Sequence, residues 1–274
     1  MLTLNAHAKV NLGLSVLGKR SDGLHEVDTL LARLELHDTV TLKPAETGVT
    51  LTVSGADLGI APEQNLAYKA AALYLRKTGE TRGIEIELTK RIPVAAGLGG
   101  GSSDAGAVLR GLKELYPADV DLLALAAQLG SDVPFFAADL SAARATGRGE
   151  VLTPVELPEL HLVLVNPGVG VSAGDAYAQV GVFAGALELP SLTASLKRGE
   201  PDYPNTLEAG VVGLEPVVGE VLDALRGAGL KGVRMSGSGA TCFGVAGDRR
   251  GAEVLAATLA EAYPAWWVAA STNL

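Results

Sequence analysis

The segment from Pro93 to Asp104 carries the residues whose types and spacing best suit the binding of an anion. Its glycines form a dense run that only Leu98 interrupts. Glycine has no Cβ, so it adopts positive φ and lets backbone N–H groups approach a ligand closely. A helix that begins after this run adds unpaired N–H donors and a favourable dipole. We therefore predict a phosphate site in this glycine-rich loop, made by Val94, Ala95, Ala96, Gly97, Leu98, Gly99, Gly100, Gly101, Ser102, Ser103 and Asp104.

A strand and a helix are predicted on the two sides of this loop. Residues 84–88 alternate between apolar and polar types, which is the period of a half-buried strand. After the loop, apolar residues recur on one helical face from 105 to 115, and Pro117 ends that helix. Ser102 or Ser103 can cap its first turn. The alternative is a mobile connection whose glycines only relieve strain, but their density before two serines favours a functional loop.

Two other glycine-rich motifs fit the chain poorly. The dinucleotide pattern GxGxxG would need a glycine at position 102, where this chain has Ser102. A P-loop needs Lys and then Ser or Thr after its last glycine, and neither follows Gly101. The segment from Gly13 to Lys19 comes closer, but Arg20 stands where Ser or Thr should bind magnesium. We therefore predict neither of these two nucleotide-binding folds.

The rest of the chain shows no internal repeat and divides into two halves. Strand pairs and helices are segregated rather than arranged as repeating βαβ units, so the predicted fold class is α+β. The Pro-containing stretch 153–158 is the predicted boundary. Helices are predicted near 65–76, 120–129, 217–225 and 252–262, and further strands near 39–43, 49–53, 162–165, 233–235, 241–245 and 266–270.

The overall composition argues against several classes of function. A formal net charge of −9 disfavours a broad basic surface for nucleic acid or an anionic membrane. A single cysteine, Cys242, excludes an internal disulfide framework and a multi-cysteine zinc site. The first residues do not resemble a signal peptide, and no apolar run is long enough to span a membrane. We expect a cytoplasmic protein with no nucleic-acid, membrane or obligate protein partner.

Three sequence blocks together resemble the motifs of the GHMP kinases, the galacto-, homoserine, mevalonate and phosphomevalonate kinases. They are residues 8–12 (AKVNL), residues 93–104 and residues 235–244 (MSGSGATCFG), in the order and spacing of that superfamily. The resemblance covers nearly the whole chain. It implies ATP as phosphoryl donor, with Mg²⁺ whose protein ligands the sequence does not assign. It also implies an amino-terminal domain like domain 2 of ribosomal protein S5 at 1–153, and a ferredoxin-like carboxy-terminal domain at 154–274.

Within that superfamily, the chain most resembles the family of 4-diphosphocytidyl-2-C-methyl-D-erythritol kinases. The likeness is carried by residues 9–14 (KVNLGL), 18–26 (GKRSDGLHE) and 130–135 (GSDVPF). It implies transfer of the ATP γ-phosphoryl group to the 2-hydroxyl of that cytidine-diphosphate-linked polyol, giving the 2-phosphate and ADP. This is a step of non-mevalonate isoprenoid synthesis.

The same resemblance assigns the catalytic roles. Asp132 is implied to take the hydroxyl proton, and Lys9 is implied to be its cationic partner. An ammonium beside a carboxylate keeps the carboxylate ionised and offsets charge that develops on the γ-phosphate. Taken alone, Asp132 would be a turn or cap residue before Pro134, and Lys9 a solvated charge on a strand edge.

The resemblance also implies residues that bind the two nucleotides. Asn11 and His25 are expected to contact the cytidine moiety, and Tyr177 to stack on cytosine opposite position 24. The family usually has tyrosine at that position, whereas this chain has Leu24, which lacks aromatic stacking. Asn65 is expected near adenine or as a helix cap, and His25 is otherwise a turn residue paired with Glu26. Gly237, Ser238 and Gly239 are expected to face the phosphates.

Two other functions remain open at this stage. The first is another GHMP kinase, such as a homoserine or mevalonate kinase, which would share the phosphate loop. Its amino-terminal block should not continue as residues 18–26 do here. The second is a non-catalytic nucleotide-binding module, which would bind ATP without releasing ADP in response to a second substrate.

Overall fold

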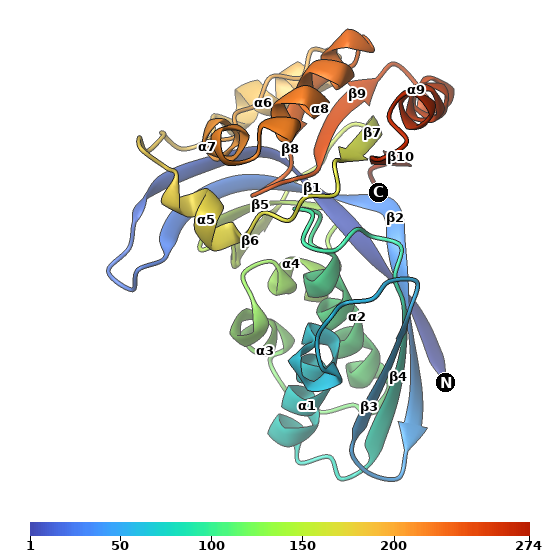
Figure 1. Cartoon of the computed structure of the whole chain (residues 1–274). Coiled ribbons are helices and arrows are strands. Elements are labelled where there is room, and N and C mark those ends of the chain that lie inside the picture. The colour runs from blue at the N-terminus through green and yellow to red at the C-terminus, as the bar shows by residue number, and fades with distance from the viewer. The chain divides into compact units, whose positions relative to one another are not determined.

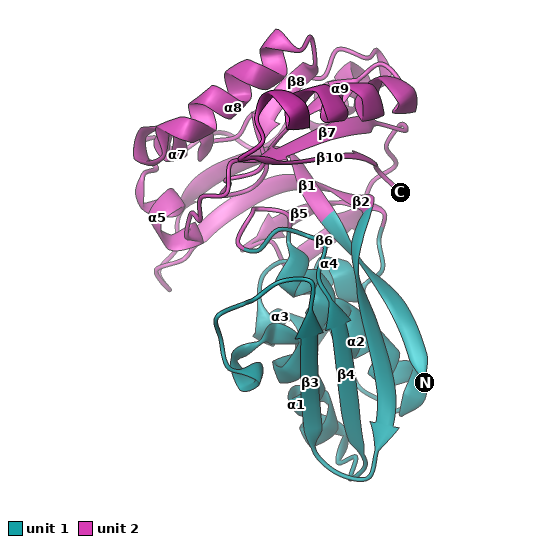
Figure 2. Ribbon diagram, turned by 45° about the vertical axis from the view of Figure 1, so that its right-hand side comes forward, with its two compact units in different colours: residues 1–8, 36–94, 99–140 teal, residues 9–35, 95–98, 141–274 magenta.

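The computed structural model describes residues 1–274 and divides into two compact units (Figure 2). Unit 1 comprises residues 1–8, 36–94 and 99–140, and unit 2 comprises residues 9–35, 95–98 and 141–274. Strands β1 (Leu2–Lys19) and β2 (His25–Ala45) pair with each other, and both have residues in each unit. The glycine-rich loop is also divided, because its residues 95–98 belong to unit 2.

Unit 1 contains parts of β1 and β2, two further strands and a group of helices. The second half of β2 pairs antiparallel with β4 (Gly83–Thr89), and β3 (Val49–Ser54) pairs parallel with β4. The helical elements of this unit are η1 (Pro62–Gln64), α1 (Leu66–Thr78), α2 (Gly100–Leu115), α3 (Leu122–Leu129) and α4 (Val133–Ala137).

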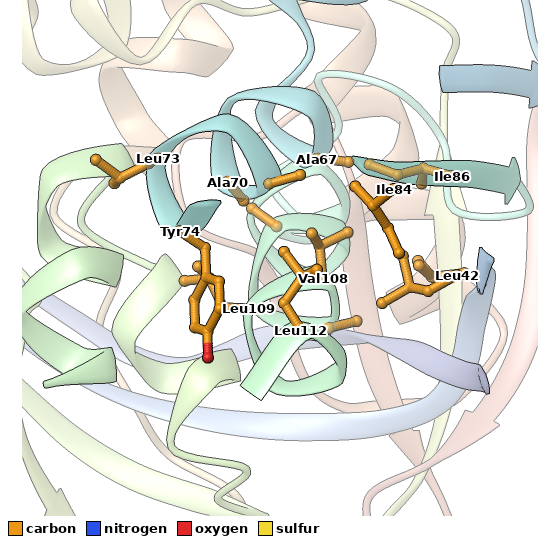
Figure 3. Close-up of a cluster of buried hydrophobic side chains, with 14 of the residues drawn as sticks. Leu42, Ala67, Ala70, Leu73, Tyr74, Ile84, Ile86, Val108, Leu109 and Leu112 are labelled. Atoms are coloured by element: carbon orange, nitrogen blue, oxygen red, sulfur yellow. The ribbon is translucent and has the colours of Figure 1, made fainter. Parts of the chain in front are cut away.

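The core of unit 1 forms where α1, α2 and β4 meet (Figure 3). Ile84, Ile86 and Leu88 of β4 are buried while Glu85 between them is exposed, as the period of a strand requires. Tyr74 of α1 is also buried, and its hydroxyl donates to the backbone carbonyl of Tyr116 at 2.7 Å. This packing fixes β4 and α2, the two elements that flank the glycine-rich loop.

Unit 2 contains two sets of paired strands and the remaining helices (Figure 1). The first half of β2 pairs antiparallel with β5 (Ala142–Gly147), which pairs with β6 (Val151–Pro154). The other sheet has the antiparallel order β10-β7-β9-β8, with bounds β7 (His161–Asn166), β8 (Lys231–Met235), β9 (Cys242–Ala246) and β10 (Trp267–Thr272).

Five helices complete unit 2. They are α5 (Ala173–Ala178), α6 (Leu189–Lys197), α7 (Glu208–Leu214), α8 (Pro216–Gly227) and α9 (Arg249–Ala262). Helices α8 and α9 pack on the four-stranded sheet and bury Val221, Leu225 and Leu259. Across residues 1–274, no helix combines the length and the apolar character that crossing a membrane would demand.

The predicted helices and strands are all present, and most agree within a few residues at each end. Strand β2 is much longer than the predicted 39–43, because it begins at His25, and α2 begins at Gly100 rather than near 105. Strands β5 and β6 and helices α4 to α7 are additional to the prediction. Helices α4 and α5 are too short for a helical period to emerge from their sequences. The division into family domains at 153 and 154 stays a prediction, because the compact units follow chain contacts and place residues 9–35 with the carboxy-terminal half.

Candidate active site

Lys9 is a buried charged residue of unit 2. It lies on β1 with 3% of its surface exposed, so it is not the solvated strand-edge charge that the residue alone would predict. Its Nζ donates to Oδ1 of Asn11 at 2.6 Å, and Nδ2 of Asn11 donates to Oγ1 of Thr29 at 2.8 Å. Thr29 in turn donates to the backbone carbonyl of Gly13 at 2.6 Å. This chain of hydrogen bonds holds the ammonium in one place.

The part of the glycine-rich loop in unit 2 lies directly against the turn that follows β8. The backbone N–H of Lys9 donates to the carbonyl of Leu98 at 3.0 Å, and Oγ of Ser236 donates to the carbonyl of Gly97 at 3.0 Å. Gly97 has φ +74, and a Cβ there would come within 2.2 Å of the carbonyl oxygen of Ser236. Only glycine fits both the conformation and the contact.

Gly237 brings the third sequence block to the same place. A Cβ on Gly237 would lie 3.0 Å from Oδ1 of Asn11 and 3.3 Å from Nζ of Lys9. The backbone N–H of Asn11 also donates to Oγ of Ser236 at 3.3 Å. Residues from all three predicted blocks therefore meet within unit 2, around the ammonium of Lys9. Ser238 is half-buried and Gly239 is buried in the same turn.

Helix α2 begins earlier than the sequence predicts. Its first residue is Gly100, and its N-cap is Gly99, which has φ +70. The expected caps Ser102 and Ser103 lie inside the helix instead, so that prediction is wrong. A left-handed glycine lets the chain enter the helix three residues earlier than a serine cap would. No side chain caps the helix, so its tip is suited to an anionic ligand.

Asp132 lies in unit 1, at the N-cap position of α4. It is half-buried, and its side chain makes no capping hydrogen bond to the helix. The simplest structural role, a helix cap, is therefore not what the side chain does. Its role as a catalytic base and its pairing with Lys9 remain predictions.

Asn65 is buried at the N-cap of α1, where its Oδ1 accepts from the backbone N–H of Ala67 at 2.8 Å. The capping role is confirmed. Asn65 also lines an open cavity of about 640 Å³ in unit 1. The remaining lining residues are Leu51, Val53, Ser54, Gly55, Ala56, Asp57, Leu58, Ile60, Ala61 and Pro62. Walls that are mostly apolar with a few polar groups suit a flat organic ring.

Of the residues expected to bind cytidine, Leu24 and His25 lie where the turn after β1 enters β2, Tyr177 lies on α5, and Asn11 lies in the middle of β1. The ring of His25 stacks on Tyr177, with centroids 5.0 Å apart and planes inclined by 24°. Glu26 pairs with Arg20 at 2.6 Å, so the alternative pairing of His25 with Glu26 is not formed. Leu24, which precedes His25 in the sequence, is 46% exposed. The side chain of Asn11 is less available to a ligand, because its Oδ1 accepts from Lys9 and its Nδ2 donates to Thr29.

Phe183 is another aromatic residue near this pair, and the sequence does not predict it as a site residue. Its ring centroid lies 6.5 Å from that of His25, and the residue is 48% exposed. It belongs to a segment that is fixed on unit 2 by two backbone donors. Ala184 donates to the carbonyl of Val16 at 2.9 Å, and Leu187 donates to Oδ2 of Asp28 at 2.9 Å. No motif marks Phe183, because these anchors lie far away in the sequence.

Comparison with known proteins decides the family. A family model described as GHMP kinases N terminal domain matches residues 65–139, and one described as GHMP kinases C terminal matches residues 191–265. A 4-diphosphocytidyl-2-C-methyl-D-erythritol kinase of Deinococcus radiodurans is 51% identical, over 97% of this chain and 91% of its own. The chain belongs to the GHMP kinase family. This GHMP kinase is accordingly an ATP-dependent kinase of a small molecule.

Solved structures confirm the two-domain α+β fold of this GHMP kinase. The crystal structure of a 4-(cytidine 5'-diphospho)-2C-methyl-D-erythritol kinase superposes with a TM-score of 0.89 at 43% identity, covering 100% of both chains. The relative of the same enzyme name from Thermus thermophilus is 46% identical over 92% of each chain. A homoserine kinase of Cytophaga hutchinsonii, at 22% identity and a TM-score of 0.67 over 100% of this chain and 96% of its own, shares the fold alone.

Proposed function

We propose that this GHMP kinase transfers the γ-phosphoryl group of ATP to the 2-hydroxyl of 4-diphosphocytidyl-2-C-methyl-D-erythritol, giving the 2-phosphate and ADP. The meeting of Lys9, Gly97 and Gly237 in unit 2 is the observation that carries the phosphoryl-transfer part. The choice of alcohol is supported by relatives with that enzyme name at 51% and 46% identity. The reaction would take place in the cytoplasm, as a step of non-mevalonate isoprenoid synthesis.

The glycine-rich loop would bind the ATP phosphates through backbone N–H groups. Residues 94–99 lead into the uncapped tip of α2, whose N–H groups and dipole favour negative charge. Among residues 1–274 no cluster of three or more His, Cys, Asp or Glu is arranged to hold a metal. Mg²⁺ that accompanies ATP commonly keeps phosphate and water ligands and takes only one or two protein carboxylates. A cluster of three such residues is therefore not required for this chemistry.

Lys9 and Asp132 would act on the reacting groups. Phosphoryl transfer needs positioning and charge stabilisation more than covalent help from the protein. The ammonium of Lys9, held by Asn11, would offset the charge on the transferred phosphoryl group. Asp132, whose side chain does not cap α4, would accept the proton of the attacking hydroxyl.

Two separate surfaces would bind the two bases. The cavity at Asn65 would take adenine, because its walls in unit 1 are largely apolar. Tyr177 and His25 would bind cytosine in unit 2, with Leu24 packing on the base without stacking. Phe183 would add an aromatic surface beside His25.

An assay with matched alcohols tests the proposed substrate. ADP release is measured with the cytidine-linked polyol, with homoserine and with mevalonate, at equal concentrations. We expect release only with the cytidine-linked polyol. Release with homoserine or mevalonate instead would assign the chain to another GHMP activity. ATP binding without release for any of the three alcohols would indicate a non-catalytic nucleotide-binding module.

A further inference from the structure

A buried cluster of three charged side chains joins the two ends of the glycine-rich loop within unit 1. Asp38 on β2, Lys90 after β4 and Asp104 on α2 are 0%, 7% and 1% exposed. Nζ of Lys90 donates to Oδ2 of Asp104 at 2.6 Å and also donates to Oδ2 of Asp38. None of the recognised motifs contains Asp38 or Lys90.

Asp38 also fixes the chain where it approaches the loop. Its Oδ1 accepts from the backbone N–H of Ile92 at 2.9 Å and from that of Arg91 at 2.5 Å. The backbone N–H of Lys90 donates to the carbonyl of Ser54 on β3 at 2.8 Å. Residues 90–92 are therefore held by side-chain and backbone bonds immediately before Pro93.

The start of α2 lies close to Lys90 and Ile92. A Cβ on Gly100 would lie 3.1 Å from Cγ2 of Ile92 and 3.4 Å from Nζ of Lys90. The ammonium of Lys90 thus lies next to the space beside Gly100, the first residue of α2, and it bonds to Asp104 one turn further. Contact and charge together set the spacing between the chain before the loop and the helix after it.

Burying these charged groups costs free energy that a contact serving only to stabilise the fold would not require. Two carboxylates and one ammonium are buried together, and Oδ1 of Asp104 is buried with no hydrogen-bond partner. Burial raises the pKa of the Asp104 carboxyl to about 7, against the opposing effect of the Lys90 ammonium. Replacing a buried ion pair with well-packed apolar residues is often neutral or stabilising, so stability alone does not account for this cluster.

We propose that Asp38 and Lys90 are positioning residues that set the geometry of the phosphate loop and so determine its affinity for ATP. They act through Asp104, Ile92 and the first residue of α2 rather than by touching the reacting atoms. This inference rests on the proposed assignment of residues 94–104 to the ATP phosphates. It does not depend on which alcohol is phosphorylated.

The test compares Lys90→Met and Asp38→Asn with a core variant of the same helix, Leu109→Ala. Leu109 is fully buried in α2, in the apolar core, so its truncation lowers Tm by leaving a cavity without touching the cluster. For each protein, Tm, the Kd of ATP by titration, and KM and kcat are measured well below every Tm. Asp38→Asn keeps the shape of the side chain and one side-chain oxygen that can accept from backbone N–H groups. It therefore provides a folded variant even if Lys90→Met does not fold.

We expect Lys90→Met and Asp38→Asn to weaken ATP binding by about tenfold or more, as a displaced binding group does. The KM of the alcohol should stay near its wild-type value, and Leu109→Ala should keep wild-type ATP affinity despite a lower Tm. Unchanged ATP affinity in the folded cluster variants would overturn the proposal, as would an equal loss for ATP in Leu109→Ala. If the wild type binds ATP but phosphorylates no cytidine-linked polyol, the proposed substrate fails while the ATP titration still decides the role of the cluster.

Discussion

At the scale of single residues, the environment of Lys9 is what gives the candidate site its chemistry. The ammonium of a flexible lysine side chain stabilises a developing negative charge well only when its position is fixed. Asn11 and Thr29 supply that fixation, and both are buried, as Lys9 is. The family resemblance implies a catalytic role for Lys9 and a cytidine contact for Asn11. Nothing in the sequence indicates Thr29, because Thr29 lies on β2 and only strand pairing brings it to Asn11.

Thr29→Val should therefore reduce catalysis without removing any group that touches substrate. Valine keeps the shape of the side chain but loses the bonds to Asn11 and Gly13, so the ammonium of Lys9 loses its support. We expect kcat to fall about tenfold, since small displacements of a catalytic group are costly. Thr258→Val is the control, because Thr258 bonds only within its own helix. A kcat equal to that of the control would show that Thr29 has no such role.

Asp132→Asn tests the proposed base directly. An amide keeps the size of the side chain but cannot accept the hydroxyl proton, so turnover should fall by about 10³-fold. The affinity for ATP, measured by titration, should stay near the wild-type value because the base acts on the alcohol. Retained turnover would remove Asp132 from the reaction.

At the scale of elements, the contact between residues 95–98 and the turn after β8 is the feature most sensitive to a single atom. Gly97→Ala would place a Cβ 2.2 Å from a backbone oxygen and would impose a positive φ on alanine. The matched control is Gly199→Ala, where φ is +69 and nothing lies within 4 Å.

Gly199→Ala should lower the free energy of unfolding by about 1 kcal/mol, which is the cost of a positive φ for alanine. Gly97→Ala should lose an additional 1–3 kcal/mol, roughly, because the clash is with backbone. It should also weaken ATP binding, whereas the control should not. Denaturant unfolding and ATP titration of both variants check these expectations. Equal losses in the two variants would mean that the contact between loop and turn is not rigid.

The segment that carries Phe183 is the element where side-chain chemistry should determine selectivity for the base. Tyr177→Leu and Phe183→Leu should each raise the KM of the cytidine-linked polyol about fivefold, since an aromatic contact contributes about 1 kcal/mol. Val182→Ala is the control from the same segment, because Val182 is 82% exposed. If Phe183→Leu behaves like Val182→Ala in steady-state kinetics, Phe183 does not touch the substrate.

Sequence and structure agree at this scale where a local pattern decides the outcome. The strand before the loop and the helix after it follow from residues 84–88 and 105–115, because each has a clear period. The sequence pattern places the start of α2 too late, since a left-handed Gly99 replaces a serine cap. The cluster of Asp38, Lys90 and Asp104 leaves no sequence signal, because its members become neighbours only when β2, β4 and α2 pack together.

At the scale of the whole molecule, the family assignment extends over both units. Matches to the two family models lie at 65–139 and 191–265, and a relative at 51% identity covers 97% of the chain. Homoserine and mevalonate kinases share the fold at 22% and 17% identity, so the fold alone does not choose the alcohol. The choice depends on local residues such as His25 and Tyr177.

Identification of the product formed by the wild-type protein tests the proposed phosphoryl transfer. ATP, Mg²⁺ and 4-diphosphocytidyl-2-C-methyl-D-erythritol are incubated with the protein, and the mixture is examined by phosphorus NMR and mass spectrometry. We expect one new phosphomonoester, attached at the 2-hydroxyl and formed in an amount equal to the ADP. Phosphate at another position, or ADP accompanied only by inorganic phosphate, would contradict the proposed transfer.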